Sequence, residues 1–310
     1  MKNSLEKGIV LKSTGKDYII QSATGDRVKA VIKGNWRIKG IRTTNPIAVG
    51  DRVEYDYDGV NQAIITNLIP RKNNIVRRSI NLSKASHVLA ANVDQAIIIV
   101  TPDKPKTSYG FIDRFLVAAE SYHIPAIIVI NKIDLEGVGN KIEEVFMTYA
   151  LVDYPVIKVS AEENINLDEF KKLLDGKVSA LAGHSGVGKS TLINKLDPNL
   201  NLHTREISDY HQMGQHTTTF AEMHPLNSGG YIIDTPGIKG FGIVGISKEE
   251  LALYFPEMKA LLHKCKFYNC THINEPKCAV KDAVEEGSIP ESRYYSYLSM
   301  FNEDENQNYR

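Results

Sequence analysis

One stretch of nine residues constrains the fold of this chain more than any other. Residues 183–191 read Gly-His-Ser-Gly-Val-Gly-Lys-Ser-Thr, which fits the spacing glycine, four residues, glycine, lysine and a hydroxyl residue. Such a loop wraps backbone N–H groups around nucleotide phosphates, and its glycines permit backbone angles that a Cβ atom would block. The apolar run 178–182 before it predicts a buried strand, and the helical spacing of 189–196 after it predicts a helix. The sequence therefore predicts a strand, a phosphate loop and a helix in succession.

Each position of this loop has an expected role. Lys189 is expected to reach the β- and γ-phosphates, and the Ser190 hydroxyl is expected to bind Mg²⁺. The alternative, a glycine-rich turn with a chance lysine, does not account for the flanking strand and helix patterns. The predicted nucleotide-contacting residues are Gly183, His184, Ser185, Gly186, Val187, Gly188, Lys189, Ser190 and Thr191.

A second polar segment, upstream of the loop, predicts which base is bound. The apolar run 126–130 ends in Asn131-Lys132-Ile133-Asp134. The carboxylate of Asp134 can accept hydrogen bonds from the N1–H and 2-amino groups of guanine, a pattern that adenine does not offer. Asn131 is expected to support the base and the neighbouring loop, and the stem of Lys132 is expected to lie over the ring. We therefore expect a guanine nucleotide.

A third segment follows the apolar run 156–159. Ser160 and Ala161 come directly after this run and are expected to place backbone N–H groups near the guanine O6. The alternative is that both polar segments are ordinary strand ends with no ligand. Their position at strand ends of the sheet that carries a phosphate loop favours base recognition.

The remaining nucleotide-contacting segments follow the loop. Asp234, at the end of the predicted strand 231–233, is expected to bind Mg²⁺, and the Gly237 N–H is expected to sense the γ-phosphate. The polar stretch 201–215 and the threonines after it are expected to form a nucleotide-dependent switch. Either Thr217 or Thr218, with Thr218 preferred, is expected to complete the Mg²⁺ shell.

The residue that orients the attacking water is less obvious. Many GTPases place a glutamine after Asp-x-x-Gly for this purpose, but this chain has Ile238 there. An apolar side chain cannot orient water, so we expect a slow intrinsic rate that rises when a partner binds. His216 is the candidate catalytic residue; the alternative is a histidine that only packs or caps.

The order of these segments is the reverse of the usual one, because the base-reading segments precede the phosphate-binding ones. Alternating apolar runs and helical segments from residue 93 onward predict a parallel α/β sheet. A sheet can still assemble from a circularly permuted chain, because neighbours in space need not be neighbours in sequence. In this order the segment 234–237 leads directly into the C-terminal region, which could receive the nucleotide state.

The first 80 residues predict a basic β-barrel. They carry 15 Lys and Arg against 7 Asp and Glu, a balance of +8, whereas the rest of the chain carries 22 against 30. Five short strand patterns in residues 7–69 indicate a small closed barrel, with the OB-fold first and an SH3-like barrel second. The expected strands are 8–12, 18–23, 27–33, 52–57 and 63–69.

Two basic segments of this region could contact RNA. One is a loop in which Trp36 stands among cations, a composition that suits nucleic acid; the alternative is a solvated loop with Trp36 packed inward. The other is the linker 71–78, which shows no strong periodicity and could contact phosphate or be merely solvated. The predicted RNA-binding residues are Trp36, Arg37, Lys39, Arg71, Lys72, Arg77 and Arg78.

The three cysteines of the chain lie close together near the C-terminus. Cys265, Cys270, His272 and Cys278 offer three thiolates and one imidazole, the donors that a structural, tetrahedral zinc ion prefers. His263 is the spare candidate for the fourth ligand. Because no run reaches the roughly 18 apolar residues of a membrane span, and no signal peptide is apparent, we expect a cytoplasmic protein that does not enter the membrane.

Together these motifs resemble the circularly permuted small ribosomal subunit biogenesis GTPase family RsgA (YjeQ). The similarity runs from the barrel, ending in Ile69-Pro70-Arg71-Lys72-Asn73, through the motifs at 131–134, 183–191, 214–219 and 234–237 to the Cys265–Val280 stretch. It implies a multidomain protein with an OB-fold RNA-binding domain (1–72), a permuted GTPase domain (73–240) and a mainly α-helical zinc-binding domain (241–310). The proposed catalytic histidine of the family maps to His216, whereas Gln215 stands where arginine is common.

The resemblance also implies a function. Members bind the small (30S) ribosomal subunit and its rRNA late in assembly, use Mg²⁺ with GTP, and couple hydrolysis to GDP and phosphate, stimulated by the subunit, to their own release and that of assembly factors. We expect a monomer. The alternatives are a P-loop kinase, which should lack the motif at 131–134, and a non-catalytic RNA-binding scaffold, against which Lys189, Ser190 and Asp234 argue.

Overall fold

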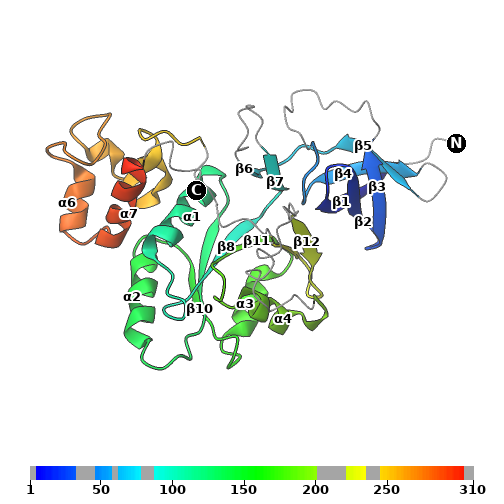
Figure 1. Ribbon diagram of the computed structural model, residues 1–310. Coiled ribbons are helices and arrows are strands. Elements are labelled where there is room, and N and C mark those ends of the chain that lie inside the picture. The colour runs from blue at the N-terminus through cyan, green and yellow to red at the C-terminus, as the bar shows by residue number, and fades with distance from the viewer. Residues whose placement is uncertain are drawn as a thin grey trace, which may run out of the picture. The chain divides into compact units, whose positions relative to one another are not determined.

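The computed structural model describes residues 5–32, 46–57, 62–77, 87–200, 221–234 and 245–303 (Figure 1). Contacts within it define two interleaved units. The first unit comprises Met1–Gln95, Leu173–Leu181 and Met213–Ile238. The second unit comprises Ala96–Lys172, Ala182–Gln212 and Lys239–Arg310. The chain therefore passes between the units several times.

Five strands of the first unit form the predicted closed barrel. They are β1 (Glu6–Ser13), β2 (Asp17–Ser22), β3 (Arg27–Ile32), β4 (Arg52–Tyr57) and β5 (Ala63–Leu68). Their order is β1-β2-β3-β5-β4, and β1 closes the barrel by pairing with β4 as well as β2. Alternate residues point inward, as Val53 and Tyr55 on β4 illustrate, and fill the barrel with apolar side chains. This arrangement confirms the expected OB-type barrel.

The basic linker contains a strand that its sequence pattern does not predict. Residues Asn74–Arg77 form β6, which pairs antiparallel with β7 (His87–Ala91) in a separate two-stranded sheet. The register shifts between Ile75 and Val76, because Leu89 is an extra residue on β7. Strand β6 itself has only four residues, Asn74–Arg77, and this length is too short for period-2 alternation to mark it in the sequence.

An ion pair buried at the end of the barrel fixes the start of the same linker. The guanidinium of Arg71 donates two hydrogen bonds of 2.6 Å to the carboxylate of Asp51, which is wholly buried, and one of 3.0 Å to the Pro46 carbonyl. The neighbouring Lys72 pairs with Asp94. Both predicted RNA-binding residues thus have partners within the chain, so their contact with RNA stays a prediction.

The barrel continues into strands from the nucleotide-binding part of the chain. Strand β13 (Tyr231–Asp234) runs parallel to β11 (Val178–Ala182) and antiparallel to β12 (Glu222–Pro225). Strand β12 in turn pairs antiparallel with β1, where Lys12 lies opposite Glu222 and their Nζ and Oε2 atoms are 3.1 Å apart. One strand of the barrel therefore lies in the same sheet as the strand that ends in Asp234.

The second unit holds the parallel strands predicted from residue 93 onward. Strands β8 (Gln95–Val100), β9 (Ala126–Ile130) and β10 (Val156–Lys158) pair parallel in the order β10-β9-β8. Every residue of β8 and β9 is buried, which explains their continuous apolar sequences. The accompanying helices are α1 (Tyr109–Ser121), α2 (Gly139–Ala150), α3 (Leu167–Leu174) and α4 (Lys189–Leu196). Among the described residues no helix is long and apolar enough to cross a membrane.

The C-terminal part of this unit is mainly helical, as expected. Its regular elements are short 3₁₀ turns at Leu251–Tyr254 and Leu262–Lys264 and the helices α5 (Pro256–Lys259), α6 (Ala279–Glu285) and α7 (Glu291–Asn302). Phe255 and Tyr297 meet edge to face in its core, with ring centroids 5.6 Å apart.

A fully buried arginine joins this C-terminal part to the α/β part. Arg293 on α7 donates to Asp113 of α1 at 2.8 Å and to Glu257 of α5 at 2.8 and 3.1 Å. Asp113 also accepts a hydrogen bond of 2.8 Å from the Tyr149 hydroxyl. Burial raises the pKa of Asp113, and the positive charge of Arg293 opposes that shift. A charge buried to this degree needs partners, so α1, α5 and α7 are held in one arrangement.

The Arg71 ion pair gives a test of the barrel. Replacing Arg71 with methionine should leave the Asp51 carboxylate buried without its partner and lower the free energy of unfolding by about 3 kcal/mol. Urea denaturation followed by circular dichroism measures this change. Arg27, an exposed cation on β3, is the matched control, and Arg27→Met should change stability by less than about 0.5 kcal/mol. Equal effects of the two substitutions would contradict the structural role of Arg71.

Candidate functional site

The phosphate loop adopts backbone angles that require glycine at two positions. Gly183 has φ +146°, and a Cβ atom there would lie 2.5 Å from the Ile99 carbonyl oxygen. Gly188 has φ +90°, and a Cβ atom there would lie 2.5 Å from the side-chain nitrogen of Asn131. These approaches are too close for any side chain, so the loop lies directly against the ends of β8 and β9.

Helix α4 begins immediately after this loop. Gly188 is its N-cap residue, and the predicted ligands Lys189, Ser190 and Thr191 form its first turn. The N–H groups of a first turn have no partners within the helix, and they attract phosphate oxygens. The ammonium group of Lys189 donates a 2.8 Å hydrogen bond to the Gly183 carbonyl, so its side chain folds back over the loop. This places a positive charge beside the backbone that is expected to hold phosphates.

The side-chain amide of Asn131 connects the phosphate loop with the base-reading segments. Its nitrogen donates to the Val187 carbonyl at 2.8 Å, and its oxygen accepts from the Ala161 N–H at 3.2 Å. Only 1% of Asn131 is exposed. The three segments predicted from sequence to bind one guanine nucleotide are thus brought together in the second unit.

The predicted base-reading carboxylate is held by a buried serine. The hydroxyl of Ser160 donates to Asp134, and the same hydroxyl accepts a 3.0 Å hydrogen bond from the Glu163 N–H. Lys132 has φ +62°, and its ammonium group donates to the Lys104 carbonyl at 2.6 Å. The β8–α1 loop that contains Lys104 is a neighbour of the site that sequence analysis missed, because no motif marks it.

Several predicted site residues lie outside the described part of the chain. Asp234 is described only by its backbone, which pairs with Leu181 two positions before the phosphate loop, and Arg77 only by its place on β6. The roles predicted for these side chains stay predictions. Residues outside the described ranges are His216, Thr217, Thr218, Gly237, Ile238, Trp36, Arg37, Lys39 and Arg78.

The four predicted zinc ligands gather in one place. The Sγ atoms of Cys265, Cys270 and Cys278 and a ring nitrogen of His272 all lie within 4.8 Å of one another. His272 Nδ1 is 3.3 Å from Cys278 Sγ and 3.7 Å from Cys265 Sγ, so Nδ1 is the nitrogen that faces the thiols. Ligand atoms of a tetrahedral zinc site are about 3–4 Å apart, given zinc–ligand bonds of about 2.0–2.3 Å. The cluster therefore fits one structural zinc ion.

Neighbouring side chains fix the loop that carries His272. The hydroxyl groups of Tyr294 and Tyr297 on α7 donate to the backbone carbonyls of His272 and Thr271 at 2.6 and 2.7 Å. The carboxylate of Glu275 accepts from the N–H groups of Thr271 and Ile273 at 2.8 and 3.0 Å. These contacts hold the backbone of the loop and so restrict the position of His272.

The thiols of Cys270 and Cys278 are poorly ionised without a metal. Burial, assisted by Cys278 and Cys265, raises the pKa of Cys270 to about 12 although the His272 backbone opposes the shift, and burial also raises the pKa of Cys278. Zinc binds the thiolate form, so binding must release these protons. The affinity for zinc should accordingly fall as the pH is lowered.

The comparisons with known proteins cover nearly the whole chain. The sequence profile described as RsgA GTPase matches residues 68–244. A small ribosomal subunit biogenesis GTPase RsgA from Phocaeicola vulgatus is 52% identical over 306 residues, covering 98% of this chain and 99% of the relative. The protein of the same description from Flavobacterium psychrophilum is 49% identical over 308 residues and covers 98% and 94%.

Two solved structures resemble this one. The crystal structure of YjeQ from Thermotoga maritima has a TM-score of 0.78 and 38% identity, and the match covers 96% of this chain and 98% of that chain. The structure of YloQ, described as a circularly permuted GTPase, has a TM-score of 0.77 and 27% identity, covering 99% and 98%. These matches confirm the permuted GTPase fold expected from the order of the motifs.

The Asp134 carboxylate gives a test of base selection. Asp134→Asn removes the acceptor for the guanine N1–H and 2-amino groups, and it should weaken GDP binding about 100-fold or more. The new amide can donate to the 2-oxo group of xanthine, so binding of xanthosine diphosphate should improve. Fluorescence titration with both labelled nucleotides measures the change. A variant that binds GDP as the parent does would contradict the assignment of Asp134.

The zinc cluster gives a second test, for which the chain supplies its own control. His272→Ala should lower the zinc content measured by elemental analysis and make the C-terminal part more sensitive to proteolysis, because a ligand is lost. His263→Ala should leave both properties unchanged, since His263 lies outside the cluster. If the His263 variant lost zinc and the His272 variant kept it, the assignment of the fourth ligand would be wrong.

Proposed function

Because the chain belongs to the RsgA family of GTPases, we propose that it binds the small (30S) ribosomal subunit late in the assembly of that subunit. Binding of the subunit stimulates hydrolysis of GTP to GDP and phosphate, and hydrolysis is coupled to release of the protein itself and of assembly factors. The names of its close relatives, small ribosomal subunit biogenesis GTPases, support this proposal.

The observation that carries the proposal is the connection made by Asn131. It joins the phosphate loop, through Val187, to the segment at Ala161 that is expected to read the base. A kinase would need only the phosphate loop, and a non-catalytic scaffold would need neither. A joined phosphate and guanine site favours a GTPase cycle over both alternatives.

The proposed chemistry uses Mg²⁺ and one histidine. Ser190, Thr218 and Asp234 would hold Mg²⁺ against the phosphates, and the Gly237 N–H would sense the γ-phosphate. In place of the usual glutamine, His216 would orient the attacking water once the subunit is bound, because Ile238 cannot. The intrinsic rate is then slow and the stimulated rate fast.

The proposed RNA contacts come from the basic barrel. The cations of the N-terminal part attract phosphate groups without regard to sequence, and Trp36 supplies a stacking surface beside Arg37 and Lys39. Arg77 and Arg78 would extend this surface along the linker. Arg71 and Lys72, engaged by Asp51 and Asp94, would contribute mainly by holding the linker in place.

The proposal includes the organisation and location of the protein. We propose three functional parts: a barrel (1–72) for rRNA, a permuted GTPase part (73–240) and a zinc-binding part (241–310). The protein would work as a monomer in the cytoplasm, where small subunits are assembled. Its partners are the subunit, rRNA, and GTP or GDP.

Phosphate release from GTP, with and without purified small subunits, tests the proposal. We expect the subunits to raise the rate at least tenfold and ATP to remain uncleaved. His216→Ala should reduce the stimulated rate about 100-fold, the usual contribution of a residue that positions water or accepts its proton, without weakening nucleotide binding. His123→Ala, a substitution in the α1–β9 connection, is the control and should leave the stimulated rate unchanged.

Co-sedimentation with small subunits completes this test. The protein should sediment with subunits in the presence of a non-hydrolysable GTP analogue and be largely released in GDP. Equal binding in both nucleotides would refute the proposed timing, and a stimulated rate unaffected by His216→Ala would remove that residue from the mechanism.

A further inference from the structure

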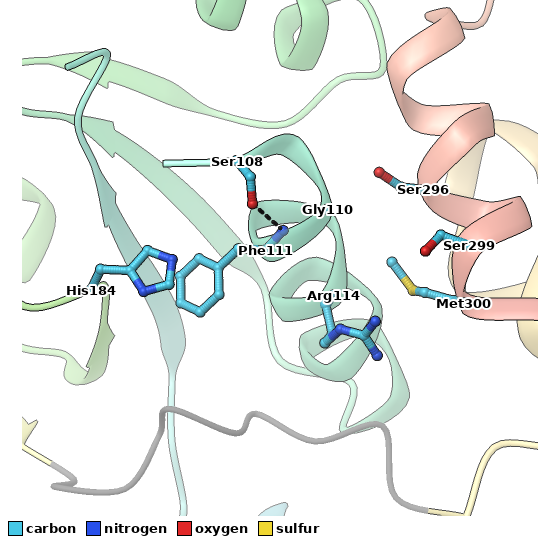
Figure 2. A pocket seen from close by; sticks show the side chains of 8 residues that line it. All are labelled: Ser108, Gly110, Phe111, Arg114, His184, Ser296, Ser299 and Met300. Atoms are coloured by element: carbon cyan, nitrogen blue, oxygen red, sulfur yellow. Dashed lines mark hydrogen bonds between the residues drawn. The ribbon is translucent and has the colours of Figure 1, made fainter. Parts of the chain in front are cut away.

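A stacked pair of rings connects the phosphate loop to helix α1. The imidazole of His184, the second residue of the loop, lies on the phenyl ring of Phe111 with ring centroids 3.7 Å apart and planes inclined by 28° (Figure 2). Phe111 is the third residue of α1, and its N–H donates to the hydroxyl of the N-cap residue Ser108. The start of α1 and the loop are thus in direct contact.

The C-terminal helix α7 and the residue that follows it contact the same end of α1. Asp113 accepts from the buried Arg293, and Arg114 forms a two-pronged ion pair with Glu303, in which Nη1 and Oε2 are 2.9 Å apart. Both contacts lie within three residues of Phe111. The position of α7 therefore fixes the part of α1 that bears the ring.

A cavity of about 360 Å³ adjoins the stacked rings. Figure 2 shows the side chains of α1, the loop and α7 around it. Its lining residues are Ser108, Gly110, Phe111, Arg114, His184, Ser296, Ser299 and Met300. Loss of the Phe111 ring would enlarge this cavity. The cavity would then lie against the imidazole of His184, and the dispersion contacts of the stack would be lost.

We propose that Phe111 is a positioning residue for nucleotide binding, which holds the phosphate loop through His184, and that α7 sets its pose through Asp113 and Arg114. Phe111 is not one of the predicted nucleotide-contacting residues and would act through His184. It restricts His184, which stands between Gly183 and Ser185, and a restricted loop loses less conformational entropy when phosphates bind. This inference rests on guanine-nucleotide binding, as the proposed function does, but requires no ribosomal partner.

The inference predicts a particular pattern of effects. The loop wraps phosphates that GTP and GDP share, so both affinities should fall together when the stack is lost. Phe111 is not among the residues proposed to position the attacking water, so the intrinsic rate at saturating GTP should not change. A general loss of folding would instead lower the saturated rate together with both affinities, because less of the protein would be folded.

The first experiment compares two substitutions of Phe111 by titration with labelled GDP and GTP. Phe111→Leu keeps an apolar side chain but loses the ring, and it should raise both dissociation constants about threefold to tenfold, the usual range for an aromatic contact. Phe111→Tyr keeps the ring and should bind as the parent does. The saturated intrinsic rate should match the parent in both variants, and the melting temperature without nucleotide should fall by only a few degrees in Phe111→Leu.

Substitution of His184 tests whether the effect passes through the stack. His184→Leu should weaken binding to a similar degree, and the double variant should be no weaker than either single variant. Unchanged binding in Phe111→Leu, failure of Phe111→Tyr to retain affinity, or additive effects in the double variant would each overturn the inference.

The contribution of α7 is tested with Glu303→Gln, which removes the charge opposite Arg114 while keeping the shape. It should weaken nucleotide binding about twofold in the parent and have no effect in the Phe111→Leu background. Glu143→Gln, which removes a comparable surface charge from its pair with Lys158, is the matched control and should have no effect in either background. An effect of Glu303→Gln that persisted without the ring would refute the link between α7 and Phe111. Because none of these measurements uses ribosomal subunits, their outcome is independent of whether the protein binds them.

Discussion

The nucleotide site depends on one buried side-chain amide. Asn131 is separated by 56 residues from Val187, to which it donates, and by 30 residues from Ala161, from which it accepts. Both hydrogen bonds are made where water cannot replace them, so leaving either group unpaired would cost more than the net value of an exposed bond. A close approach of Gly188 to the same amide leaves no room for a side chain. The loops that are predicted to contact the phosphates and the base therefore hold each other in position.

The base-reading segments precede the phosphate loop in the permuted chain. They follow β9 and β10, and the strand ending in Asp234 comes after the loop. The backbone of that strand, β13, pairs with its neighbour in sequence, β12, and with β11, the strand that leads into the phosphate loop. The segment that follows Asp234 leads along the chain into the zinc-binding part. Within that part, α7 and Glu303 contact α1 close to the phosphate loop. The C-terminal part is thus connected to the site both along the chain and through packed side chains.

Sequence predicted those parts of the structure that are determined by local chemistry. Glycines with positive φ, the buried strands β8 and β9, and the thiol and imidazole spacing of the metal cluster all leave direct traces in the order of residues. Strands β6 and β12 were missed because each has only four residues, and β12 ends in proline, so neither shows enough periodicity. The partner of Arg71 and the stack of Phe111 on His184 arise from tertiary contacts. No spacing rule reveals them, because each joins residues that are far apart in the sequence.

The pairing of β12 with β1 has a consequence for the protein without its barrel. Strand β12 has two neighbours, β13 on one side and the barrel strand β1 on the other. A protein that lacks the N-terminal barrel, and with it β1, would expose the backbone N–H and C=O groups of β12 along that side. Exposed strand edges recruit strands from other molecules and lead to aggregation. The barrel therefore covers a strand edge of the GTPase part that would otherwise be prone to aggregation.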